Sequence, residues 1–191
     1  IHGPEDKLKP FEVPENGLRF TEKNYINPGD PNHLHYYIWR WFSQITAGSD
    51  EVIRHAIAGE TGNDIITKHN GLRGKVQYKI SSYNRTKKSF TVLFYTSGAD
   101  GTESLEVSIP SEIQNGKCYN NKFSKIDLRG EGFKENTRYQ AIATTKEINR
   151  STGQDEKVSI QKKNDLVVKN GKLTFRVGSI QKFSKVEFLM L

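Results

Sequence analysis

The sequence predicts a mainly β protein, an immunoglobulin-like antiparallel β-sandwich with an N-terminal arm and one or two short helices. Two observations lead to this prediction. From Lys75 onward apolar residues alternate with polar ones, which is the period of a strand with one buried face. Turn signals rich in Gly, Asn and Asp recur about every ten residues, and they divide this part into about eight or nine short strands.

The N-terminal part has a different pattern, so we predict three regions. Residues 1–29 hold four of the six prolines, which favours an extended arm. Residues 30–70 are expected to form a helical segment packed on the sandwich, and residues 71–191 the β-sandwich domain.

Two helices are expected within the helical segment. Asp30 is a candidate N-cap, and Pro31 suits the first helical position. Apolar residues then follow at spacings of three and four, which describes one helix face. They are Leu34, Tyr37, Ile38, Trp41, Phe42 and Ile45. A second helix is expected from Ser49 to Gly59. Its inward residues would be Val52, Ile53, Ala56 and Ile57.

Within the sandwich domain, alternation places the strands. The expected buried faces are Val76, Tyr78 and Ile80, then Phe90, Val92 and Phe94, then Leu105, Val107 and Ile109. Further strands are expected near 123–128, 138–145, 156–161, 165–169, 172–177 and 183–190. SGADG at 97–101 is a strong turn signal, and NGK at 115–117 and at 170–172 favours tight turns.

Charge is distributed unevenly along the chain. Residues 1–70 hold 7 Lys and Arg against 10 Asp and Glu, whereas residues 71–191 hold 22 against 12. A basic module of this kind suggests a polyanionic partner. Lysines that protect strand edges from aggregation are the alternative explanation.

The sequence offers no credible catalytic constellation, so we expect no enzyme, no cofactor and no metal site. His33 and His35 are two residues apart at a helix start, where they point in different directions. Cys118 is the only cysteine, which excludes an intramolecular disulfide, and no motif supplies it with a histidine partner.

The aromatic run YYIWRWF could stack sugars or bases, but its helical spacing favours packing. No apolar run is long enough to span a membrane.

Basic residues in the strand connections are the candidate ligand-binding groups. Connections present the recognition groups of a sandwich, and in an immunoglobulin-type order alternate connections gather at one end. The candidate DNA-binding residues are Arg85, Lys87 and Lys88 in YNRTKKS, Arg129, Lys134 and Arg138 around RGEGFKEN, and Lys162 and Lys163 in DEKVSIQKKN. Together they could form a surface for a phosphate backbone. The central cluster is partly neutralised by Glu131, Glu135 and Glu147.

From residue 76 to residue 163 the order of features resembles the immunoglobulin-fold DNA-binding domains of the Rel, Runt and STAT transcription factors, with the Runt domain as the nearest pattern. Two strands, VQYKISSYN and SFTVLFY, precede the SGADG turn and the strand SLEVSI. A polar segment ending in an aromatic residue, a short apolar strand, the basic turn RGEGFKEN and a long hairpin follow.

The resemblance implies a nuclear regulator of transcription that binds double-stranded DNA sequence-specifically. In that class the basic turn and the segment after the last strand contact DNA. By position, the corresponding residues are Arg129, Lys134, Lys162 and Lys163. Arginine would read guanine edges and lysine would hold phosphates. A homodimer or another protein partner is left open.

A second class of function stays open, namely an extracellular or cell-surface sandwich module for adhesion to a carbohydrate or protein ligand. Its support is a pair of glycosylation sequons, at Asn84 and at Asn149, together with the lack of disulfides expected of a bacterial surface protein. A structural or viral assembly protein is a third reading. A salt-dependent DNA titration separates the first class from the second.

Overall fold

The computed structural model describes residues 50–54, 56–57, 64–72, 75–120, 122–148 and 155–191. The predicted arm and the first predicted helix, with Trp41 on its apolar face, lie outside the described residues. The same is true of His33, His35 and the sequon at Asn149.

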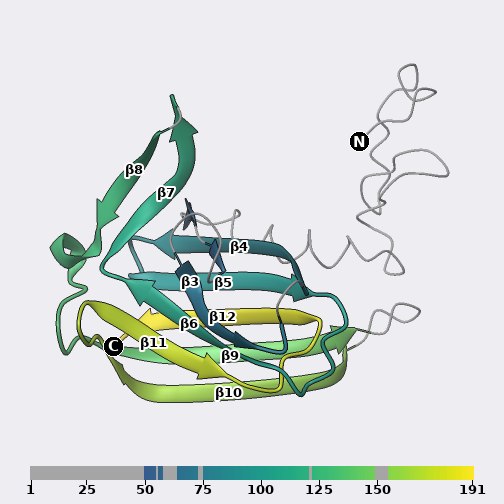
Figure 1. Cartoon of the computed structure of the whole chain (residues 1–191). Coiled ribbons are helices and arrows are strands. Elements are labelled where there is room, and N and C mark those ends of the chain that lie inside the picture. Colours follow the sequence, from purple (N-terminus) through teal and green to yellow (C-terminus); the bar gives the residue numbers. More distant parts are fainter. Residues whose placement is uncertain (1–49, 55, 58–63, 73–74, 121, 149–154) are drawn as a thin grey trace, which may run out of the picture.

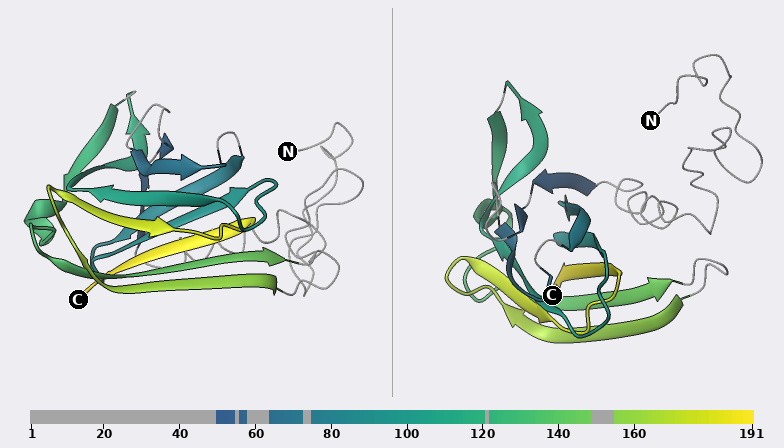
Figure 2. Two further views of the ribbon diagram at one scale, coloured as in Figure 1. Left: turned by 60° about the horizontal axis from the view of Figure 1, so that its bottom comes forward. Right: turned by 45° about the vertical axis from the view of Figure 1, so that its right-hand side comes forward.

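Two β-sheets form a sandwich-like fold, which confirms the predicted mainly β class (Figures 1 and 2). The larger sheet has eight strands in the order β10-β9-β12-β5-β4-β1-β7-β8, and the smaller has four in the order β11-β6-β3-β2. The larger sheet consists of β1 (Asp50–Arg54), β4 (Val76–Asn84), β5 (Ser89–Thr96), β7 (Glu112–Tyr119), β8 (Lys122–Asp127), β9 (Arg138–Ile148), β10 (Asp155–Val167) and β12 (Phe183–Met190). The smaller sheet consists of β2 (Ala56–Ile57), β3 (Asp64–Asn70), β6 (Ser104–Pro110) and β11 (Lys172–Val177). The described pairs are antiparallel except for the short parallel pair of β2 and β3.

The alternating sequence pattern explains how the two sheets make one core. In β11, Leu173, Phe175 and Val177 are buried while the residues between them are exposed. Their side chains face the larger sheet, where the ring of Phe188 lies 6.4 Å from that of Phe175 in an edge-on arrangement. The predicted face of β5 that includes Phe94 belongs to the same core. Burial of these apolar faces is the main source of stability.

The second predicted helix is wrong, because Asp50–Arg54 form strand β1 and Ala56–Ile57 form strand β2. The apolar spacing of this stretch also fits a helix, but β1 pairs with β4 and β7, so contacts remote in sequence decide its structure. Ile53 is buried and its neighbour Val52 is exposed, as expected of a strand. The sheets therefore include residues from Asp50 onward that the sequence pattern placed in the helical segment.

Only one of the two predicted NGK turns is a turn. At 170–172 Asn170 and Gly171 have φ of 51° and 69°, and they connect β10 to β11. Residues 115–117 instead lie inside strand β7, so this prediction is wrong. A Cβ on Gly116 would lie 2.9 Å from the carbonyl oxygen of Val52, so the glycine permits close approach of β7 to β1.

The hairpin of β7 and β8 extends away from the rest of the sandwich (Figures 1 and 2). At the opposite edge of the larger sheet, β9 and β10 form the long hairpin that the sequence predicts. Among the described residues, no helix is long and apolar enough to cross a membrane.

Candidate ligand-binding site

Three connections meet at one end of the larger sheet, on the left in Figure 1. They are the β4–β5 turn, the β8–β9 connection and the β10–β11 turn. A Cβ on Gly132 in the second connection would lie 3.4 Å from the Lys88 Nζ of the first. The backbone N–H of Asn170 in the third donates to the Glu135 carboxylate at 3.2 Å. Segments far apart in sequence therefore form one surface.

The RGEGFKEN segment is a crossing connection and not a hairpin tip. Its flanking strands β8 and β9 pair with other strands and lie far apart in the sheet order. The segment begins with a 3₁₀ helix, η2 (Leu128–Glu131), whose N-terminal cap is the Asp127 side chain. Leu128 and Phe133 are buried in the core. These apolar anchors fix the backbone that presents Arg129 and Lys134 to solvent.

Glu131 joins η2 to the β4–β5 turn. The Tyr83 hydroxyl donates to Glu131 Oε2 at 2.6 Å, and Arg85 Nη1 donates to Glu131 Oε1. Arg85 also donates from Nε to Glu51 Oε1 at 3.0 Å. Burial, and then the hydrogen bond to Glu131, raise the pKa of Tyr83 well above its ordinary value, so its hydroxyl stays a donor.

The other two predicted arginines also have carboxylate partners. Arg129 Nε and Nη2 donate to the two oxygens of Asp127 at 2.8 and 2.7 Å, a bidentate pair. The side-chain bond and then the backbone bond from Arg129 lower the pKa of Asp127. Arg138 Nη2 lies 3.6 Å from Asp165 Oδ1. Contact of Arg129 with a base would therefore require its release from Asp127.

The lysines at this end differ from the arginines in their ion pairing. Lys87, Lys88 and Lys134 are exposed, and within the described part of the chain none has a carboxylate partner. The same holds for two lysines that the sequence reasoning missed, Lys169 and Lys172, which flank the β10–β11 turn. The NGK turn signal beside Lys169 could have revealed them. We call these five residues, Lys87, Lys88, Lys134, Lys169 and Lys172, the lysine end.

Lys162 and Lys163 are not placed as the sequence predicted. They were expected in a segment after a strand, but β10 continues through both to Val167. The break expected before residue 165 is a register shift between Lys163 and Leu166. Both lysines are exposed within the strand at the edge of the sheet, outside the turns that form the lysine end.

The sequon at Asn84 has a structural role. Asn84 is buried, and its Oδ1 accepts the backbone N–H of Lys87 at 2.9 Å, which stabilises the β4–β5 turn. A glycan would have to be attached to a side chain that is enclosed in this turn. This sequon therefore gives no support to an extracellular location.

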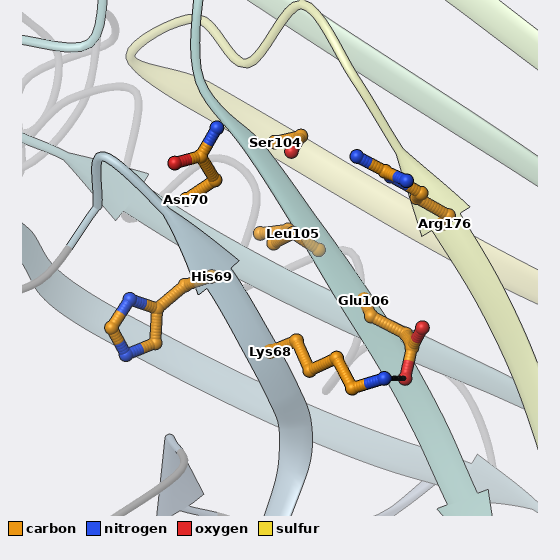
Figure 3. Close-up of a pocket in the computed structure, with 7 residues that line it drawn as sticks. All are labelled: Lys68, His69, Asn70, Ser104, Leu105, Glu106 and Arg176. Atoms are coloured by element: carbon orange, nitrogen blue, oxygen red, sulfur yellow. Dashed lines mark ion pairs between the residues drawn. The ribbon is translucent and has the colours of Figure 1, made fainter.

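A shallow pocket of about 260 Å³ on the smaller sheet is the other candidate site (Figure 3). It is lined by Lys68, His69, Asn70, Ser104, Leu105, Glu106 and Arg176. Lys68 Nζ lies 4.0 Å from Glu106 Oε1, and the strand register places Arg176 beside Glu106 on the other side. Because opposite charges already lie in one row across three strands, the lysine end is the stronger candidate.

Comparisons with family models, curated proteins and solved structures found no match to this chain. The resemblance to the Runt domain therefore stays a prediction, and the function has to be inferred from the geometry. Among the described residues, no group of three or more His, Cys, Asp or Glu side chains could hold a metal ion.

Tyr83→Phe should lower the free energy of unfolding by about 1.5–3 kcal/mol, because it deletes a hydrogen bond to a charged carboxylate. The ring stays stacked on Phe90 at 4.7 Å, so packing is retained. Urea unfolding measures the change. Tyr139→Phe is the matched control, since Tyr139 is equally buried but its hydroxyl has no hydrogen-bond partner among the described residues. An equal loss in both variants would show that the Glu131 bond is not the cause.

Proposed function

We propose that this chain binds double-stranded DNA through contacts of the lysine end with the phosphate backbone. The observation that carries the proposal is the convergence of five exposed lysines from three connections, without carboxylate partners among the described residues. An ammonium group that meets a phosphate releases the counterion condensed there, which drives association.

The turns supply a fixed backbone for these lysines. Lys134 N–H donates to Thr137 Oγ1 at 3.2 Å, and that hydroxyl donates to the Gly132 carbonyl at 3.0 Å. Lys169 and Lys172 bond to each other through their backbones. Because the backbone is already ordered, a phosphate contact costs mainly the freedom of the lysine side chain.

The arginines have a different role in this proposal. Arg85, held by Glu51 and Glu131, ties β1, the β4–β5 turn and η2 together. Phosphate contacts position a protein on DNA without reading its sequence. Sequence-specific binding, as the resemblance implies, would need a further step in which Arg129 exchanges Asp127 for a guanine edge.

The test is a titration of labelled duplex DNA at several salt concentrations. Five phosphate contacts give a slope of log affinity against log salt of about −4.5. Lys87→Gln combined with Lys134→Gln should make this slope shallower by about 1.8 and weaken binding to all sequences alike. The matched control is Lys122→Gln combined with Lys157→Gln, which removes the same charge from exposed positions away from the lysine end. The control should keep the parent slope.

Equal losses in the two double variants would mean that net charge alone attracts DNA, and the lysine end would not be the site. If the parent shows no affinity at physiological salt, DNA is not the ligand. A carbohydrate or protein ligand for an adhesion module would then be the better explanation.

A further inference from the structure

A second group of buried apolar residues lies on the face of the larger sheet that is turned away from the smaller sheet. Leu93 and Tyr95 alternate along β5 with residues of the core between the sheets, so their side chains point to the opposite face. Phe183 of β12 pairs with Tyr95, and their rings lie 5.1 Å apart. Leu93, Tyr95 and Phe183 are 1%, 5% and 3% exposed and do not belong to that core. We call these three residues the outer patch.

The outer patch needs a cover that the described elements do not provide. The described strands all belong to the two sheets, and η2 lies at the lysine end, so no described helix or strand lies over the patch. Ile160 lies on the same face as Leu93 and in the same row across the strands, yet it is 67% exposed. A place on this face therefore does not by itself bury a side chain, and a further segment has to lie over Leu93.

The extent of this burial matches the width of one helix. Leu93 and Phe183 are on the neighbouring strands β5 and β12, whereas Ile160 is on β10, three strands from β5. Neighbouring strands are about 4.8 Å apart, which places β10 about 14 Å from β5. A helix with its side chains is about 10–12 Å wide. A single helix over β5 and β12 therefore covers the outer patch and leaves β10 exposed.

The chain that precedes β1 is long enough to form this helix, and it ends in a suitable place. β1 begins at Asp50, two strands from β5 and in the same row as Ser89 at the start of β5. From Ser89 to Tyr95 the sheet extends about 20 Å. A helix from the N-cap signal at Asp30 to Gly48, a residue type that often ends helices, would be about 27 Å long.

The sequence of this segment also fits the outer patch. Its apolar stripe, which runs from Leu34 to Ile45 and includes Trp41, is predicted to form one helix face. Aromatic and aliphatic side chains on that face can pack against the rings of Tyr95 and Phe183. Because the segment is attached to β1, its effective concentration at the sheet is on the order of millimolar, which favours it over a second copy of the chain.

We propose that residues 30–47 cover the outer patch as an amphipathic helix over β5 and β12, with Trp41 on the side that faces the sheet. The larger sheet then has apolar contacts on both faces at these two strands. This inference does not rest on DNA binding.

Tryptophan fluorescence of the full chain, without nucleic acid, tests the proposal. The chain has two tryptophans, Trp39 and Trp41, and both lie in this segment. Two residues apart on a helix, they lie on nearly opposite sides. In Trp39→Phe, the remaining Trp41 should emit at short wavelength and resist quenching by acrylamide, because it is buried against the sheet. In Trp41→Phe, the remaining Trp39 should emit at longer wavelength and be quenched several-fold more efficiently.

Leu93→Thr, made in the Trp39→Phe protein, tests where Trp41 lies. Loss of the apolar contact should shift the emission of Trp41 to longer wavelength and make its quenching more efficient. Leu173→Thr in the same protein is the matched control, because it makes the same change at a residue that is equally buried in the core between the sheets. While circular dichroism shows that the fold is retained, the control should leave the emission of Trp41 unchanged.

Three results would overturn the proposal. The first is equal quenching of Trp39 and Trp41, which needs no change in the sheet and so decides the matter even if Leu93→Thr does not fold. The second is emission of Trp41 that ignores Leu93→Thr or responds equally to Leu173→Thr. The third is protection of Trp41 that disappears on dilution, with dimers in sedimentation velocity, which would identify a second copy as the cover.

Discussion

Phe133→Ala should lower the free energy of unfolding by about 3–5 kcal/mol, as truncation of a buried aromatic side chain does. Phe133 is 2% exposed. Its ring lies 6.0 Å from that of Phe90 in an edge-on arrangement and 5.8 Å from that of Tyr139. The variant loses this burial and leaves a cavity beside the rings of Phe90 and Tyr139.

The substitution should also disturb the lysine end, because Phe133 anchors the segment that presents Lys134. We expect weaker DNA binding by Phe133→Ala under conditions in which it is still folded. Urea unfolding, followed by circular dichroism, gives the stability change. Lys134→Ala is the matched control, since its exposed side chain should alter stability by less than about 0.5 kcal/mol. A Phe133→Ala variant as stable as the parent would contradict the buried placement of this ring.

Lys75→Met should destabilise the fold by about 3–5 kcal/mol at neutral pH, because it leaves a buried carboxylate without its partner. Glu103 is only 4% exposed, and its Oε1 lies 2.7 Å from Lys75 Nζ. Glu103→Gln should cost less, because the Lys75 side chain is 39% exposed and can turn to water. This order of the two variants is the expected result of urea unfolding at neutral pH.

Lowering the pH should reduce the loss of stability that Lys75→Met causes. Burial opposes ionisation of Glu103, but the bonds from Lys75 and from backbone N–H groups outweigh it, so the folded protein has a lowered pKa at this residue. A lowered pKa stabilises the fold above the ordinary value of about 4.3, and this contribution is lost as pH falls through the folded value. In Lys75→Met the carboxyl group can be protonated, so the deficit should shrink on acidification. If the difference in free energy of unfolding between Lys75→Met and the parent stays constant between pH 7 and pH 3.5, the buried charge is not its cause.

The sequence pattern predicted the elements correctly where the spacing of apolar residues fits a strand and does not fit a helix. The strands expected at 172–177 and 183–190 coincide with β11 and β12, and in β11 strict alternation after a tight turn leaves no helical alternative. The pattern failed at residues 50–54 and 56–57, where the spacing fits both a helix and a strand. Only the pairing of β1 with β4 and β7 decides between them.

The location of the candidate site could be predicted from the sequence, but the ion pairs within it could not. The clusters around Lys88 and Lys134 do converge, as turn positions suggested. The ion pairs that neutralise Arg85 join it to Glu51 and Glu131, which are 34 and 46 residues away in the sequence. Local patterns contain no information about such pairs. The sequence pattern therefore favoured Arg129, whereas among the described residues at this end the basic groups without a carboxylate partner are lysines.

The position of β12 in the larger sheet has a consequence for the order of folding. β12 is the last strand in the described chain, yet it lies between β9 and β5. Until it has been synthesised, β9 and β5 cannot be bridged, and both would present unpaired edges during translation. Such non-local closure is slow and exposes intermediates to aggregation. We therefore expect the larger sheet to close late in folding, when β12 pairs with both β9 and β5.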